Sequence, residues 1–341
     1  MIIVVIAGGS GTRLWPISTP AYPKHLLKVG NDSRSMLQNT YYRASKLSKK
    51  IYVVSEINQL PHIQEQLPGL NEDHLIIEPA RRGTAHCIIA ALARIKSRED
   101  ASEPIVFMAA DHYIRDTKGF VQTFTIAAET ATVNNQITLV GIKPDYAATG
   151  FGYIKKGALS SEHTVVYNVE CFEEKPAYDD AQAYLESGEY LWNASYFVGS
   201  LNVFESEMAG NAPELYTSYQ QLLTADDFSA TYQSFGNESI DYALIEKVPH
   251  LQVVPAAFDW VDLGSFADFS KAIGGDIEGN YIHGPNIELF DVSNSLVQNY
   301  EDKQIAIIGI DNCVVINTPH GLLVTRKDLS QKVGLISRKP Q

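Results

Sequence analysis

Short apolar runs, often rich in β-branched residues, recur along the first 140 positions, and glycine or polar residues separate them. Residues 2–6 open the series, and similar runs lie at 51–54, 75–77, 105–108 and 137–140. An unbroken run of this kind predicts a strand that is buried on both faces of a parallel sheet.

Helix-like stretches lie between these runs, at residues 36–47, 85–96 and 120–132. Alternating strands and helices predict an α/β domain with a mostly parallel sheet. Ligands of such sheets bind at the carboxyl ends of the strands. Gly8-Gly9 and Asp111 both follow a predicted strand directly, so we expect them to lie close together.

The pattern changes after Phe269. Short strand-like pieces now follow one another at residues 287–290, 295–298, 305–308, 313–316 and 322–325, with turn residues between them. No helix-length periodic segment intervenes before Leu329. The sequence therefore predicts a large domain over residues 1–270 and a small all-β module over residues 285–341.

Chain length and charge agree with this division and restrict the partners. A chain of 341 residues is suited to one large domain plus a small one. The net charge of -13 argues against a nucleic-acid or anionic-membrane partner, because binding to such surfaces needs clustered Lys and Arg. It still permits a local basic site for a small phosphorylated ligand.

The sequence favours a cytoplasmic location. The apolar start is too short for a signal peptide, and no apolar run approaches the roughly 20 residues that span a bilayer. Cys87, Cys171 and Cys313 are scattered without metal-ligand spacing, so we expect buried free thiols in a reducing compartment.

A glycine-rich segment carries the strongest chemical signal. Residues 7–16 are AGGSGTRLWP, and Pro23-Lys24 follow. Three glycines in four positions after a strand let backbone N–H groups approach a phosphate chain closely. Arg13 can donate two hydrogen bonds to phosphate oxygens, and Lys24 adds a second positive charge. The spacing matches neither a Rossmann fingerprint nor a Walker A loop.

At these residues the chain resembles the sugar-1-phosphate nucleotidyltransferases, and the RLWP form with Trp15 is similar to the mannose-1-phosphate guanylyltransferase branch. The resemblance implies a Rossmann-like (GT-A-like) nucleotidyltransferase domain with a mostly parallel mixed sheet, and a C-terminal module like a left-handed β-helix. It implies nucleotide binding by Ala7, Gly8, Gly9, Gly11, Thr12, Arg13, Glu78, Arg82, Thr84 and Ala85.

The segment that begins at Glu78-Pro79 is similar to the guanylyltransferase pattern EPxxRNTA. Gly83 stands where that pattern has Asn, so a base or ribose contact made by that amide is missing here. Without the resemblance, this segment would simply be a helix N-terminus with Thr84 near the cap.

Two carboxylates are implied metal ligands. Asp111 follows a strand in the sequence AADH, where the family has PADH, and Asp262 lies in WVDLGS, which resembles the family's W-x-D-V-G-[ST]. Mg²⁺ takes one or two protein carboxylates and leaves its other positions to phosphates and water. We expect structural roles for His112 and Asp259, which lie beside these two positions.

The sugar side resembles the family in four segments: TGFGYI at residues 149–154, FEEKP at 172–176, LWNASYF at 191–197 and SIDYA at 239–243. In the third, Ala194-Ser195 replaces Ser-Gly. The implied sugar-binding residues are Gly150, Gly152, Tyr153, Glu174, Lys175, Asn193 and Asp241. For Asp241, a role at a helix N-terminus is an equal alternative.

The resemblance implies a magnesium-dependent enzyme that makes GDP-mannose from GTP and mannose 1-phosphate, with Arg13, Lys24, Asp111, Lys175 and Asp262 as catalytic residues. Another nucleotide or another sugar remains an alternative, as does a non-catalytic regulatory subunit that binds a sugar nucleotide. The β module could also join two chains as a homodimer.

Overall fold

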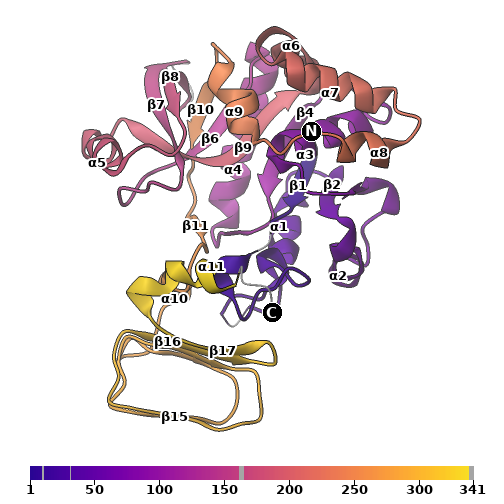
Figure 1. Cartoon of the computed structure of the whole chain (residues 1–341). Coiled ribbons are helices and arrows are strands. Elements are labelled where there is room, and N and C mark those ends of the chain that lie inside the picture. The colour runs from indigo at the N-terminus through magenta and orange to yellow at the C-terminus, as the bar shows by residue number, and fades with distance from the viewer. Residues whose placement is uncertain (10, 31, 161–164, 338–341) are drawn as a thin grey trace.

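The computed structural model describes residues 1–9, 11–30, 32–160 and 165–337 (Figure 1). Ser10 of the glycine-rich segment and the last four residues of the predicted β module lie outside this part of the chain. A nine-stranded mixed sheet in the order β3-β2-β1-β4-β9-β6-β10-β8-β7 forms the centre of the larger domain. Its strands are β1 (Ile2–Ala7), β2 (Ile51–Glu56), β3 (Leu75–Glu78), β4 (Pro104–Ala109), β6 (Thr138–Ile142), β7 (Gly152–Leu159), β8 (Tyr167–Glu173), β9 (Tyr190–Ser200) and β10 (Gln252–Pro255).

The predicted strands of the first 140 residues are all present in this sheet. β1 pairs in parallel with both β2 and β4, and β2 pairs in parallel with β3. The long strand β9 runs antiparallel to β4 and β6, which makes the sheet mixed. The Rossmann-like α/β prediction is therefore confirmed, and the carboxyl ends of β1 and β4 meet at one edge.

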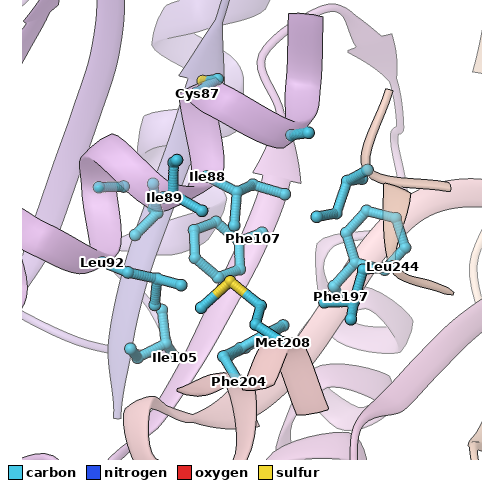
Figure 2. Packing of buried hydrophobic residues seen from close by; sticks show 14 of the residues in the cluster. Cys87, Ile88, Ile89, Leu92, Ile105, Phe107, Phe197, Phe204, Met208 and Leu244 are labelled. Carbon is cyan, nitrogen blue, oxygen red and sulfur yellow. The ribbon is translucent and has the colours of Figure 1, made fainter. Parts of the chain in front are cut away.

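Alternate residues of β1 face two separate apolar cores. Ile2 and Val4 pack on one side of the sheet, and Ile3 and Val5 pack on the other. On the first side, Phe107 of β4 packs against helices α3 (Gly83–Lys96) and α6 (Leu201–Asn211), as Figure 2 shows. The helices α1 (Met36–Ala44) and α4 (Thr117–Asn134) cover the second side. Burial on both faces explains why these strands lack polar alternation.

The remaining helices connect or cover these layers. They are α2 (Leu60–Gln66), α5 (Tyr178–Ser187), α7 (Pro213–Leu223), α8 (Phe228–Gln233), α9 (Ile240–Ala243), α10 (Phe266–Ile273) and α11 (Val333–Ile336). Two short strands, β5 (His112–Tyr113) and β11 (Val261–Asp262), pair as a separate ribbon.

The C-terminal segment coils into a stack of rectangular turns (Figure 1). β12 (Tyr281–His283), β14 (Leu296–Asn299) and β16 (Cys313–Thr318) stack in parallel along one side, while β13 (Ile287–Phe290) and β15 (Ile305–Ile308) form another. β17 (Gly321–Arg326) ends the stack antiparallel to β16. This arrangement confirms the predicted β-helix-like module.

The structure corrects one of the expectations about the cysteines. Cys87 and Cys313 are buried, but Cys171 is exposed, because it lies on the partly solvated strand β8. Among the described residues, no helix is both long and apolar enough to cross a bilayer.

Candidate active site

Lys24 brings the two predicted metal carboxylates together. Its Nζ lies 2.8 Å from Oδ2 of Asp111 and 2.5 Å from Oδ1 of Asp262. Asp111 follows β4, and Asp262 reaches the same point because β11 pairs with β5, with Asp262 opposite His112. Two positions about 150 residues apart in the sequence thus share one ammonium group.

Burial and charge act in opposite directions on Lys24, whose side chain is almost fully enclosed. Burial alone would lower the Lys24 pKa, but attraction to Asp111 and Asp262 outweighs it and raises the pKa above its ordinary value. Burial would likewise raise the pKa of Asp111, and the Lys24 ammonium holds it well below its usual range. Lys24 and Asp111 are therefore both charged at neutral pH.

The glycine-rich loop is held against the same lysine. Gly11 has a left-handed backbone (φ 57°), and a Cβ there would lie 2.7 Å from the backbone nitrogen of Lys24. The hydroxyl of Ser18 donates to the carbonyl of Gly11. A single 3-10 turn, η1 (Thr12–Leu14), follows and presents Arg13 at the surface. Only glycine permits this close approach without displacing the lysine.

A cavity of about 420 Å³ opens at the carboxyl ends of β1 and β4. Six predicted site residues line it, namely Gly8, Gly9, Glu78, Arg82, Thr84 and Asp111. Other predicted residues of the nucleotide set do not line it: Ala7 and Ala85 are fully buried behind it, and Gly11, Thr12 and Arg13 lie outside it. For Ala7 and Ala85 the structure leaves no side-chain contact with a ligand.

Glu78 occupies the wall of this cavity as a buried carboxylate. The Tyr232 hydroxyl donates to Oε1 of Glu78. Burial raises the Glu78 pKa, and the hydrogen bond from Tyr232 opposes that rise. Cys87 lines the same wall, and burial raises its thiol pKa well above the ordinary value. Sequence reasoning missed Tyr232, because its contact with Glu78 joins positions 154 residues apart.

Gly83 fits a tight backbone contact. Its φ is 79°, and a Cβ at this position would lie 2.6 Å from the carbonyl carbon of Glu238. The N–H of Ala85 donates to the carbonyl of Glu238, and the Thr84 hydroxyl accepts from the N–H of Ile240. The Asn of the family pattern cannot be placed here without moving this backbone.

Four of the predicted sugar residues, Glu174, Lys175, Asn193 and Asp241, form a polar cluster. Asn193 donates from Nδ2 to Oδ1 of Asp241 at 2.7 Å, and Lys175 Nζ lies 2.5 Å from Oε1 of Glu174. Oε2 of Glu174 is buried, faces the Cα of Gly152 and has no hydrogen-bond partner among the described residues. An unpartnered buried carboxylate oxygen is suited to a ligand hydroxyl.

Burial raises the pKa of Asp241 to about 6, and the charge of Glu174 adds to the rise. The hydrogen bond from Asn193 and the charge of Lys175 only partly offset it. Asp241 is also the first-turn acidic residue of the four-residue helix α9. This is the helix N-terminal position that the sequence offered as the alternative role.

Lys175 and Ser195 adopt strained backbone conformations at this site, with φ of 52° and 54°. The other non-glycine residues with positive φ in the described chain are Asn or Asp, which tolerate this region better. Asn193 supports Ser195, because its Oδ1 accepts the Ser195 N–H at 3.0 Å. Ser195 also lines the 420 Å³ cavity, so it lies between that cavity and the cluster around Asn193. The family's glycine at this position was the signal that could have found it.

Tyr153 does not reach the sugar cluster, contrary to the sequence-based expectation. It is fully buried, and its hydroxyl accepts the N–H of Ala148. As alternate residues of a strand point to opposite faces, Tyr153 faces the core while its neighbour Gly152 lies against Glu174. Gly150 is exposed in the preceding loop.

His112 and Asp259 have the structural contacts expected of them. His112 Nδ1 lies 2.7 Å from the Tyr196 hydroxyl, and its ring packs edge-on against Trp260. Asp259 accepts the backbone N–H groups of Arg115 and Asp116 at 3.0 and 2.7 Å. These contacts hold the ribbon of β5 and β11 that carries Asp262.

The residues around Lys24 fit a single magnesium ion shared with substrate. In the described part of the chain, no three His, Cys, Asp or Glu side chains converge on one point as a metal site. Asp111 and Asp262 instead offer two carboxylates beside the glycine-rich loop. That donor set suits Mg²⁺, which keeps water and substrate phosphates in its remaining positions.

Comparison with known proteins agrees with this geometry. Residues 2–278 match the nucleotidyl transferase family, and residues 286–338 match the MannoseP isomerase/GMP-like β-helix domain. The chain belongs to the nucleotidyl transferase family. Within it, the chain groups with the mannose-1-phosphate guanylyltransferases, as the sequence predicted.

Two sequence relatives cover nearly the whole chain. It is 33% identical to a mannose-1-phosphate guanylyltransferase of Escherichia coli, over 98% of this chain and 74% of the relative. It is 34% identical to the xanthan biosynthesis protein XanB of Xanthomonas campestris, over 97% and 71%.

Solved structures show the same fold. Mannose-1-phosphate geranyltransferase from Thermus thermophilus superposes with a TM-score of 0.88 at 26% identity, covering 98% of this chain and 97% of that one. A UDP-glucose pyrophosphorylase complexed with UDP-glucose, at 16% identity and a TM-score of 0.53, covers 80% and 97% and shares the fold alone.

Proposed function

We propose that this enzyme transfers GMP from GTP to α-D-mannose 1-phosphate, forming GDP-mannose and pyrophosphate. The observation that carries the proposal is the convergence of Asp111 and Asp262 on Lys24 at the end of the nucleotide cavity. The full-length similarity to proteins named mannose-1-phosphate guanylyltransferase supports the choice of substrates.

The reaction needs positioning and charge neutralisation more than proton transfer. A phosphate oxygen of mannose 1-phosphate attacks the α-phosphorus of GTP and forms a new P–O bond. The bond from that phosphorus to the β-phosphate oxygen breaks, and pyrophosphate leaves with the bonding electrons. The attacking phosphate is already ionised at neutral pH, so no side chain has to act as a general base.

Three basic residues bind the phosphates of the two substrates. Arg13 and Lys24, on the loop that follows β1, neutralise the triphosphate and the leaving pyrophosphate. Lys175, in the sugar cluster, directs the attacking phosphate. The charge of Lys175 is favoured by its contact with Glu174, and its pKa is raised although burial opposes the rise.

Asp111 and Asp262 would hold Mg²⁺ together with phosphate oxygens of the substrates. The ion would supply charge neutralisation at the reacting phosphates. The two carboxylates lie 2.8 and 2.5 Å from the same Lys24 ammonium nitrogen, so they are close enough to ligate one ion.

Glu78 would supply the guanine selectivity. Guanine presents two adjacent donors, N1–H and N2–H₂, and a carboxylate accepts both. Glu78 is buried in the cavity wall, with Tyr232 fixing Oε1. Adenine lacks this pair of donors and would leave the remaining acceptor capacity of the buried carboxylate unfilled, which costs about 1–3 kcal/mol per group.

On the sugar side, the buried Oε2 of Glu174 would accept a hydrogen bond from a hexose hydroxyl. Asn193 is engaged with both Asp241 and Ser195, so it would mainly position these two residues. Each of its polar groups keeps capacity for one further bond to the sugar.

Pyrophosphate release across a panel of nucleotides and sugar phosphates tests the proposal. GTP with mannose 1-phosphate should give the highest kcat/KM. A preference for UTP, dTTP or ATP would replace the guanylyltransferase assignment with another branch of the family. Binding of sugar nucleotide without turnover on any pair would support a regulatory subunit.

We also propose that the enzyme works in the cytoplasm as a homodimer. The three free cysteines suit a reducing compartment. Phe290 and Ile308 lie side by side on β13 and β15 and are largely exposed, which suits contact between two β modules. Sedimentation of the wild type and of Phe290→Ser would test the second point; a monomeric wild type would contradict it.

A further inference from the structure

The glycine-rich nucleotide loop is in direct contact with the C-terminal module. Trp15 lies against Gly321, the first residue of β17, and a Cβ at position 321 would lie 2.7 Å from indole Cζ2. Gly321 therefore admits the Trp15 ring, and any side chain there would displace it.

The side chain of Arg13 lies close to two further glycines. A Cβ at Gly334, in helix α11, would lie 3.1 Å from Cγ of Arg13, so the aliphatic stem of Arg13 rests on this helix. A Cβ at Gly264 would lie 3.4 Å from Nη1 of Arg13 and 3.6 Å from Oδ2 of Asp262. The guanidinium is thus placed beside the carboxylate centre, although Arg13 itself is an exposed residue.

The C-terminal segment is firmly joined to this region. Leu14 shares one apolar cluster with Phe266 of α10, Leu323 of β17 and Val333 of α11. The fully buried Ser330 accepts the N–H of Ala267 through its hydroxyl at 3.2 Å. Helices α10 and α11 accordingly lie beside the N-terminal segment in Figure 1. A displacement of α11 would therefore be transmitted to Arg13.

We propose that Gly334 and Gly321 are positioning residues for the nucleoside triphosphate, and that the C-terminal module sets the direction of Arg13 and Trp15 toward its phosphates. This inference rests on the proposed function of the loop. The C-terminal module would then take part in substrate binding, because its residue Gly334 contacts the side chain of Arg13, the arginine of the glycine-rich loop.

Gly334→Leu in the full-length protein tests the inference. The new side chain should push the Arg13 stem away and weaken GTP binding by roughly tenfold or more, the scale of a displaced binding group. Binding of mannose 1-phosphate should change less than twofold, as its residues lie in the other cluster. Gly210→Leu is the matched control, because Gly210 also lies in a helix but faces open space. Titration calorimetry with each ligand separates the two effects.

A double-mutant cycle shows whether the effect passes through Arg13. In an Arg13→Ala background, Gly334→Leu should lower GTP affinity by less than about threefold. Equal losses for both ligands, or an undiminished loss in that background, would overturn the inference. If the leucine variant does not fold, Gly334→Ala can replace it in the same double-mutant cycle, with a smaller expected loss of GTP affinity. Failure of the wild type to bind GTP would instead contradict the proposed function, and the cycle would then use the nucleotide that does bind.

Discussion

The Cα of Gly83 faces the backbone of Glu238 so closely that a Cβ at position 83 would lie 2.6 Å from the carbonyl carbon of Glu238. This contact closes the side of the nucleotide cavity formed by the start of α3, where Arg82 also accepts the N–H of Glu238 through its carbonyl. Gly83 thus allows a close backbone contact that a side chain at this position would disturb.

Gly83→Asn should therefore damage the cavity. We expect a loss of more than about 2 kcal/mol in the free energy of unfolding, from overlap with Glu238 and from the left-handed φ. Gly188→Asn is the matched control, because Gly188 has a similar φ of 68° with open space around it. It should cost about 1 kcal/mol or less. Equal costs for the two variants in denaturant unfolding would contradict the steric explanation.

Asp111→Asn and Asp262→Asn should each reduce turnover by at least about a hundredfold, the scale of losing one main electrostatic stabiliser. Each change removes a negative charge beside Lys24 while keeping the side-chain volume. Asp226 is exposed and is not one of the candidate site residues, so Asp226→Asn should keep wild-type turnover. A folded Asp262→Asn enzyme with near-normal turnover at saturating Mg²⁺ would remove that residue from the mechanism.

Lys175→Ala and Arg13→Ala should affect different substrates. Lys175 lies in the sugar cluster with Glu174, so its loss should raise the KM for mannose 1-phosphate far more than the KM for GTP. Arg13 lies beside Gly264 and should show the reverse. Calorimetry with each ligand checks this division. Equal losses for both ligands in either variant would show that the two basic residues do not serve separate phosphates.

The sequence predicted the fold well because its signals were local. The apolar runs of β1 and β4 and the turn residues between the C-terminal strands each specify an element without help from distant positions. The order of strands was less accessible. β9 enters the sheet between β4 and β6, and nothing in its own residues specifies those neighbours.

The sequence predicted which residues belong to the site, but only the structure shows which of them contact one another. Spacing alone could not show that Asp111 and Asp262 share Lys24, because β5 and β11 that bring them together are only two residues long. The contacts of Gly83 with Glu238, and of Gly334 with Arg13, also join distant parts of the chain. Pairings of this kind leave no local pattern.

Asp241 should make stability depend on pH in a predictable direction. Its pKa is raised to about 6 in the folded protein, against 3.8 ordinarily. The folded state therefore holds its proton more tightly than the unfolded state does. The stabilisation is fully present below pH 3.8 and is lost as the pH rises through 6. At 1.36 kcal/mol per pKa unit, the loss amounts to about 2–3 kcal/mol.

Asp241→Asn should remove this loss, because the amide does not ionise and its oxygen can still accept from Asn193. Unfolding free energies of the wild type and this variant should diverge between about pH 4 and pH 6, with the variant gaining. Asp226→Asn should follow the wild-type curve. Parallel curves for wild type and Asp241→Asn would show that this carboxyl is not perturbed.

Glu78→Gln should lower selectivity for GTP. The substitution keeps the volume and leaves an oxygen for the Tyr232 hydroxyl, but it replaces one acceptor with an N–H group that faces the donors of guanine. Loss of a charged hydrogen bond costs about 1.5–3 kcal/mol, so kcat/KM for GTP should fall roughly ten- to a hundredfold. The value for ATP should change less, as adenine lacks the adjacent N1–H and N2–H₂ donors that guanine would present to the carboxylate.

Glu56→Gln is the matched control for this prediction. Glu56 lines the same cavity, but its carboxylate is paired with Arg81. With its partner in place, Glu56 is not available to a base, and its variant should keep the GTP preference. If Glu56→Gln loses selectivity while Glu78→Gln keeps it, the base lies against the other carboxylate and the assignment of Glu78 is wrong. If neither variant changes the ratio of kcat/KM for GTP to kcat/KM for ATP, the base is recognised by backbone groups of the cavity.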